Sequence, residues 1–467
     1  MPNKLSACTS ILIGKKASID GSIMIGRNED AKAAWPKHMV VHPHGAVPRK
    51  FVSKETKLEI ELPDDSARYS ATPEWTDKYG LFEEDGINEY NVAMSATESA
   101  YSNSLVLGAD PLVKNGLNEE AMVTVVLPFV KTAREGVLRL GNLIAKYGTG
   151  ETNGVLFADD NEAWYFESGA GHYWVAQRIP DDCYAVVANQ LAIQEIDFND
   201  PNNFMFHPGI REFVEKNHLN PDPTTFNFRK IFGTADQSDA IYSEPRVWIG
   251  HQMFSSHQAK GETPESTELP FLMKPDRLLS VIDAQNYLSN HYEGTGFDPL
   301  TNSPSAHKYR PISLAKTQES HILQTGRKGP DIHWLAMGVA NESTYVPFFN
   351  GITKLPAAYG RGKLPAQLNS AYWIFKHASV LVDSHLHDFL PLLRDVQKER
   401  NAAAQKLIRE TDTKAAALQG DALTDYLNDQ SDKFANDTLT AYRNLAMELI
   451  TKMTDYCELN FKTDENL

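Results

Sequence analysis

The fold is constrained most by a set of short strand-like runs separated by tight-turn signals, found near residues 10–26 and again at 154–190. Two β-rich runs, residues 10–14 and 22–26, flank Asp20-Gly21, a dipeptide typical of hairpin turns. Further runs between residues 154 and 190 are separated by turn signals. We therefore expect an antiparallel hairpin that Cys8 begins, and later a meander of short strands.

Helical patterns follow each of these strand regions. Residues 117–150 carry apolar side chains at helical spacing, end in glycines, and predict one or two amphipathic helices. Residues 368–458 also read as helical, whereas residues 256–310, rich in Pro, Ser, Thr and His, predict surface loops. Strands, helix, strands and then helices is the order of a layered α+β fold and not of a parallel βαβ sheet.

Charge and cysteine content exclude several classes of protein. A formal net charge of -16 gives no basic surface for nucleic acid, and no window approaches the roughly 18 apolar residues that a membrane helix needs. Three widely spaced cysteines in 467 residues argue against a disulfide framework and for a reducing compartment. We expect a cytoplasmic protein that binds neither nucleic acid nor membrane.

Motifs for phosphates and metals are weak. The glycine-rich stretch at residues 148–154 follows a helix, where a dinucleotide fingerprint must follow a strand, and both it and residues 360–363 predict turns. The chain has no HExxH, CxxC or Gly-x-Ser-x-Gly pattern. His385 with His387, and His42 with His44, are poor metal pairs, so we expect no metal and no cofactor.

Cys8 is the residue that carries chemistry. The stretch LSAC resembles a lipoprotein processing site, but only seven residues precede Cys8, too few for the required apolar segment. A buried structural cysteine is the simpler alternative. If residues 1–7 were removed, however, Cys8 would combine a thiol with an α-amine of pKa about 7.7–8.0, suited to general base work. The hairpin would return Arg27 to this thiol, and Asp30 could hold the amine.

Three motifs in this order resemble a known class of enzyme. Cys8-Thr9-Ser10, then GRNED at residues 26–30 and DGINE at residues 85–89, resemble the cysteine N-terminal-nucleophile (Ntn) hydrolases. The resemblance is strongest to the dipeptidase A family of lactic acid bacteria and covers most of the chain. Penicillin V acylases and bile salt hydrolases share the motif order up to about residue 260. The family's later catalytic Asn and Arg fall here on Asn189 and Arg246.

The resemblance implies a four-layer αββα sandwich with a helical C-terminal extension. Its domains would be a propeptide at residues 1–7, a catalytic domain at 8–365 and a helical extension at 366–467. The implied activity is metal-free hydrolysis of many dipeptides through an acyl-enzyme on Cys8, in a homo-oligomer. Cys8, Arg27, Asp30, Asn189 and Arg246 would form the catalytic set.

Alternatives stay open at several of these points. The alternative for Arg27 and Asp30 is a solvated ion pair at a strand end. The alternatives for Asn189 and Arg246 are a turn cap and a surface ion-pair partner. The second oxyanion donor of the acylases would fall near residues 97–99, where an ionised Glu98 cannot donate. A related amidase acting on bile salts or penicillin V, or a non-catalytic secernin-like protein, would share these motifs.

Overall fold

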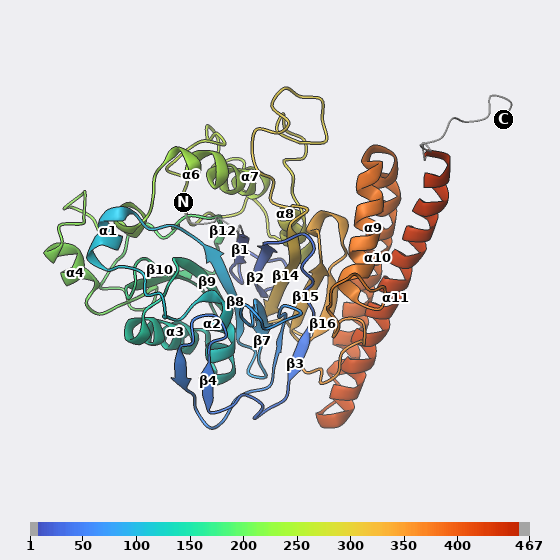
Figure 1. Cartoon of the computed structure of the whole chain (residues 1–467), viewed down its shortest axis with the longest axis horizontal. Coiled ribbons are helices and arrows are strands. Elements are labelled where there is room, and N and C mark those ends of the chain that lie inside the picture. The colour runs from blue at the N-terminus through green and yellow to red at the C-terminus, as the bar shows by residue number, and fades with distance from the viewer. Residues whose placement is uncertain (1–7, 457–467) are drawn as a thin grey trace.

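Two six-stranded antiparallel sheets form the centre of the protein in this computed structural model, which describes residues 8–456 (Figure 1). The first sheet has the order β12 (Tyr184–Val187), β1 (Thr9–Ile13), β2 (Ile23–Asp30), β14 (Thr317–Thr325), β15 (Ile332–Met337) and β16 (Val346–Phe349). The second sheet has the order β13 (Phe204–Phe206), β11 (Trp174–Ile179), β10 (Ala163–Ser168), β9 (Asn153–Ala158), β8 (Ala93–Ser99) and β7 (Asp85–Ile87).

Two small ribbons and a set of helices surround the sheets. The ribbons pair β3 (Val40–His42) with β6 (Tyr69–Ala71) and β4 (Lys50–Val52) with β5 (Glu59–Glu61). The helices up to residue 288 are α1 (Ser104–Ala109), α2 (Glu119–Val126), η1 (Leu127–Phe129), α3 (Ala133–Tyr147), α4 (Ile210–Lys216), α5 (Phe228–Phe232), α6 (Gln237–Tyr242), α7 (Glu244–Phe254) and α8 (Val281–Leu288). The later helices are η2 (Ala340–Glu342), α9 (Ala371–Ser384), α10 (Leu386–Ala415) and α11 (Gly420–Tyr456).

The predicted hairpin at the chain start is confirmed. β1 pairs antiparallel with β2, and Ser10 lies opposite Arg27. Gly21 takes a positive φ of 76°, which glycine adopts without steric cost, and the Asp20 side chain accepts hydrogen bonds from Ser22. The turn and the register together bring the end of β2 back to Cys8, the residue before β1.

Three apolar clusters separate the layers. One lies between the two sheets and contains Leu12, Ile25 and Leu323 from the first sheet with Leu156 and Val175 from the second. Because both strands of the hairpin are covered on both faces, every residue of β1 and β2 is buried. Full burial of one Leu or Ile side chain in such a layer stabilises the fold by about 1.5–3 kcal/mol.

Helices cover the outer face of each sheet. The second sheet packs Met94 and Phe157 against Val123 of α2 and Leu140 of α3. The first sheet packs against helices α7, α8, α9 and α11, and α10 packs on α9 and α11. Figure 1 shows the long helices α9, α10 and α11 along one side of the molecule. Strands and helices are thus both abundant and segregated, which confirms the predicted α+β class and the helical C-terminal region.

Two expectations from the sequence are wrong. The strands between residues 154 and 190 do not form one meander, because β12 leaves the second sheet and pairs with β1. Its apolar pattern is the same whichever strand it joins, so local sequence does not reveal the partner. The 256–310 segment is also not loop throughout, since α8 starts there with a capping box between Ser280 and Asp283. The polar composition of the longer window concealed this short signal.

Some expectations fall outside what the structure describes. The predicted propeptide, residues 1–7, and Cys457 lie outside the described residues. The predicted boundary at residue 365 falls between β16 and α9. In the range 8–456, the helices all lack an apolar stretch long enough to cross a membrane.

Candidate active site

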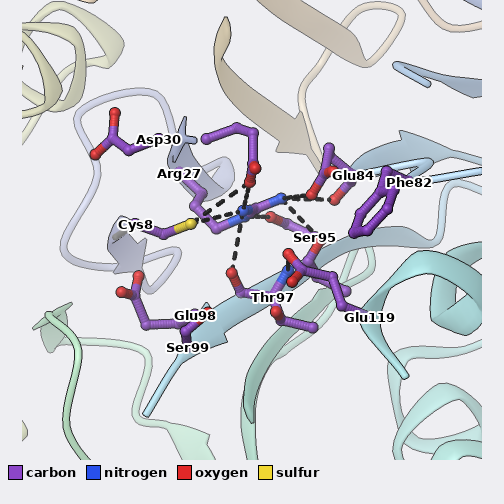
Figure 2. A network of polar contacts seen from close by, with 12 residues as sticks. Cys8, Arg27, Asp30, Phe82, Glu84, Ser95, Thr97, Glu98, Ser99 and Glu119 are labelled. Atoms are coloured by element: carbon purple, nitrogen blue, oxygen red, sulfur yellow. Dashed lines mark hydrogen bonds and ion pairs between the residues drawn. The ribbon is translucent and has the colours of Figure 1, made fainter. Parts of the chain in front are cut away.

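Cys8 lies fully buried at the start of β1, and the Arg27 guanidinium points at its thiol (Figure 2). Nη1 of Arg27 donates to Cys8 Sγ at 3.1 Å. The contact follows from the hairpin, because Ser10 pairs with Arg27 and Cys8 is two residues before Ser10. Alternate side chains on a strand share a face, so Cys8 and Arg27 both point toward the second sheet.

Arg27 is held from every side. It is fully buried, and its guanidinium donates to a ring of acceptors from β2, β8 and the segment before β7. These acceptors are Ser95 Oγ at 3.1 Å, Glu29 Oε2 at 2.6 Å, Thr97 O at 3.0 Å, Glu84 Oε2 at 2.8 Å and Ala96 O at 2.7 Å. Since guanidinium has five N–H donors in a rigid fork, this ring fixes the orientation of the group that meets Cys8. A solvated ion pair does not describe it.

Carboxylates surround the thiol and work against its ionisation. Cys8 Sγ lies 3.5 Å from Oε2 of Glu29. Burial and then Glu29 raise the pKa of the Cys8 thiol well above its ordinary value, and Arg27 lowers that pKa by less. Burial and Glu29 also raise the pKa of Glu84 to about 7, although Lys37 pairs with Glu84 at 2.7 Å. The thiol of the full-length chain is therefore protonated at neutral pH.

Arg246 and Asn189 meet on the other side of Cys8. Arg246 lies on α7, is fully buried, and donates to the Cys8 carbonyl at 2.5 Å and to Thr9 Oγ1 at 2.8 Å. It also donates to Asn189 Oδ1 at 2.6 Å. Asn189 follows β12, which pairs with β1, and its Nδ2 donates to Ser99 O and Glu98 Oε1. Neither residue is a surface group.

Glu98 stands where the second oxyanion donor was expected. It is fully buried and accepts a hydrogen bond from Ser10 at 2.5 Å in addition to the one from Asn189. Burial raises the pKa of Glu98 to about 7, against the opposing charge of Arg246. A carboxyl group with such a pKa is partly protonated at neutral pH, and a protonated carboxyl can donate.

Asp30 is buried on the opposite face of β2 from Arg27. Its carboxylate pairs with Arg310 and accepts a hydrogen bond from Thr317, and Figure 2 shows it apart from the network around Arg27. Burial raises the pKa of Asp30, with Arg310 opposing. The structure thus brings Cys8, Arg27, Asn189 and Arg246 together, while Asp30 connects to them through Arg310, which also contacts Thr9.

Two groups of described residues have ligand atoms close enough to hold a metal ion. They are Glu29 with Glu84 and Glu119, and Asp85 with Glu319 and His321. In the first group Arg27 forms ion pairs with two of the three carboxylates, and in the second the His321 ring forms ion pairs with both carboxylates. A nitrogen cation therefore compensates each group from within the chain.

Sequence reasoning missed several residues of this site. Glu29 belongs to the GRNED motif and Glu84 directly precedes the DGINE motif, so these motifs were a usable signal. Ser95, Glu119, Arg310 and His321 carry no local signal, because they reach the site from strands and segments far along the chain.

Comparison with known proteins finds a peptidase family and several dipeptidases that are similar to this chain. The profile of Peptidase family C69 matches residues 7–399. A probable dipeptidase of Latilactobacillus sakei is 46% identical over 474 residues, covering 99% of both chains. Dipeptidase A of Lactobacillus helveticus is 36% identical over 467 residues, covering 97% of both chains. A penicillin V acylase structure from Agrobacterium tumefaciens matches 74% of this chain and 87% of its own at 14% identity, with a TM-score of 0.32, too weak to assign a fold.

Proposed function

The chain belongs to peptidase family C69, and from this premise we propose that it is a dipeptidase whose nucleophile is Cys8 after removal of residues 1–7. The observation that carries the proposal is the buried contact between Arg27 Nη1 and Cys8 Sγ at the start of β1. Arg246 adds a second cation at the Cys8 carbonyl. Neither contact is needed by a cysteine that only fills a core.

The fold proposal accompanies the functional one. We take the two stacked sheets and their outer helices as the αββα sandwich of Ntn hydrolases, with residues 8–365 as the catalytic domain and 366–467 as its helical extension. The three apolar clusters support this division into layers. A cytoplasmic location and a homo-oligomer remain predictions.

The reaction follows from the residues around Cys8. The free α-amine takes the thiol proton, the thiolate attacks the single peptide carbonyl, and the resulting ammonium protonates the leaving amino acid. The Asn189 amide, by exchanging its hydrogen bond to Glu98 for one to the substrate, and backbone N–H groups stabilise the oxyanion. Water then attacks the thioester while the amine takes its proton, and collapse releases the second amino acid and restores the thiol.

Glu29 favours dipeptides over other amides. A free dipeptide carries an ammonium two bonds from its scissile carbonyl, so this ammonium must come close to Sγ during attack. The Glu29 carboxylate lies 3.5 Å from Cys8 Sγ, so it can pair with the ammonium of the dipeptide. Bile salts and penicillin V have no cation at that place.

Three measurements test the proposal. Intact mass of the purified protein should show loss of residues 1–7, and Cys8→Ala should abolish dipeptide turnover while the protein stays folded. An N-acetylated dipeptide should lose at least about a hundredfold in kcat/KM relative to the free one, because it lacks the ammonium that would pair with Glu29. Turnover by Cys8→Ala would refute the role of Cys8 as nucleophile. Hydrolysis of bile salts or penicillin V that is faster than hydrolysis of dipeptides would favour the amidase alternative. A mature chain without any turnover would favour the secernin-like alternative.

A further inference from the structure

A buried histidine lies at the Nε edge of the Arg27 guanidinium. His321 on β14 is opposite Arg27 in the pairing of β14 with β2, and it is fully buried. Its Nε2 lies 2.8 Å from Ser95 Oγ, and the same hydroxyl oxygen accepts from Arg27 Nε at 3.1 Å. Ser95 on β8 therefore joins the histidine of the first sheet to the arginine that meets Cys8.

Two carboxylates hold the other side of the imidazole. Nδ1 of His321 lies 2.8 Å from Asp85 Oδ2 and 3.0 Å from Glu319 Oε1. Asp85 belongs to the DGINE motif, and His333 from β15 faces the same carboxylate at 3.3 Å. The charged and titratable groups facing His321 are thus Asp85 from β7, Glu319 from its own strand, His333 from β15 and, through Ser95, Arg27 from β2.

We propose that His321, clamped between Asp85 and Glu319, is a positioning residue that fixes the Arg27 fork at Cys8 through Ser95. The inference rests on the proposed role of Cys8 and goes beyond it, because it assigns the DGINE aspartate a part in orienting Arg27. His321 does not reach the thiol and touches no reacting atom.

The protonation state of His321 supports this role. Burial lowers the pKa of His321, but Asp85 and Glu319 raise it more, to about 9. The ring is therefore an imidazolium at neutral pH and donates from both nitrogens. With His321 and Arg27 each donating to Ser95 Oγ, both acceptor positions of the hydroxyl are filled, and Arg27 is held from the Nε edge as well as from its two amino groups.

Ser95→Ala tests the link with a small deletion that leaves the His321 and Asp85 pair in place. In processed enzyme we expect kcat to fall about tenfold, from loss of one hydrogen bond to a charged donor, with KM changed less than about threefold. The pH profile of Cys8 alkylation by iodoacetamide should move to higher pH. Ser320→Ala is the matched control, since Ser320 is a fully buried hydroxyl of β14 bonded to Tyr345, with no contact to Arg27. Its profile should match wild type.

His321→Gln, made in wild type and in Ser95→Ala, separates a positioning role from a general effect on packing. If His321 acts through Ser95, the double variant should lose about as much kcat as either single variant, about tenfold, whereas independent effects would multiply to about a hundredfold. Multiplied effects, or a Ser95→Ala profile that matches wild type, would overturn the inference. Should His321→Gln not fold, the Ser95→Ala profile decides alone. Failure of the underlying function is a different result, namely turnover by Cys8→Ala.

Discussion

Replacing Arg27 tests the centre of the site, because the structure gives the cost of each substitution. Lysine retains the positive charge but offers three donors where guanidinium offers five. At least two buried acceptors in the ring around Arg27 then lose their donor, at about 1.5 kcal/mol each for a bond to a charged group. We expect Arg27→Lys to lower the free energy of unfolding by about 3 kcal/mol.

Arg27→Ala removes the positive charge as well, and the structure identifies which carboxylate then loses its ion-pair partner. Glu84 keeps its ion pair with Lys37, but Glu29 loses its only ion-pair partner among the described residues. Breaking a buried pair costs about 3–5 kcal/mol because one charge stays buried without compensation. Arg27→Ala should therefore cost about 4 kcal/mol, and adding Glu29→Gln should return about half of that.

Urea unfolding followed by tryptophan fluorescence measures these differences. A Cys8→Ala background removes the nucleophile from every variant, and intact mass checks that all variants have the same length. If Arg27→Ala and its combination with Glu29→Gln unfold at the same urea concentration, Glu29 is not the residue left unpaired. If Arg27→Lys matches its parent, the ring of acceptors does not stabilise the fold.

The same substitutions should change the chemistry of processed enzyme in a fixed order. Turnover should fall for Arg27→Lys and further for Arg27→Ala, and only the alanine variant should lose the charge that favours thiolate. Thiol and amine share Cys8, so the measured pKa values belong to the coupled pair. An Arg27→Ala alkylation profile that matches wild type across pH would make Arg27 a structural residue only.

Two further predictions concern pH and metals. Because the folded pKa of His321, about 9, lies above its ordinary 6.5, its contribution to stability is complete below pH 6.5 and is lost as pH rises through 9. The stability difference between wild type and His321→Gln in urea should shrink by about 3 kcal/mol over that range, and a constant difference would contradict the ion pair. Dipeptide turnover should survive EDTA, because the α-amine of Cys8 serves as the base; a loss that zinc restores would mean that a metal takes part.

Local signals were sufficient for the class of fold and for one contact of the site. The Asp20-Gly21 turn and the strand alternation set the hairpin register, and that register alone places Arg27 at Cys8. Helical spacing likewise predicted α2 and α3 and the C-terminal helices. These features depend on residues within a few turns or one hairpin of each other.

Long-range pairing was beyond the sequence. Asp30 is three residues after Arg27, an odd spacing that puts its side chain on the opposite face of β2, where Arg310 and Thr317 contact it. β12 joins β1 from more than 170 residues away, and His321 and Arg310 arrive from the segment around β14. The local sequence of these segments does not predict which strands they pair with. The residues that they contribute to the site can therefore be identified only from the folded structure.

The charge balance around Cys8 connects the proposed maturation to reactivity. Glu29, Glu84 and Glu119 bring up to three negative charges to a buried site that Arg27 and Lys37 compensate with two positive ones. A thiolate would add another negative charge, which is why burial and Glu29 outweigh Arg27 in raising the Cys8 pKa. In the proposed mechanism, cleavage before Cys8 would create an α-ammonium at this same residue, and a bound dipeptide would bring a second ammonium. Both cations would shift the balance toward thiolate, so we expect the nucleophile to be more reactive in the mature chain and most reactive when substrate is bound.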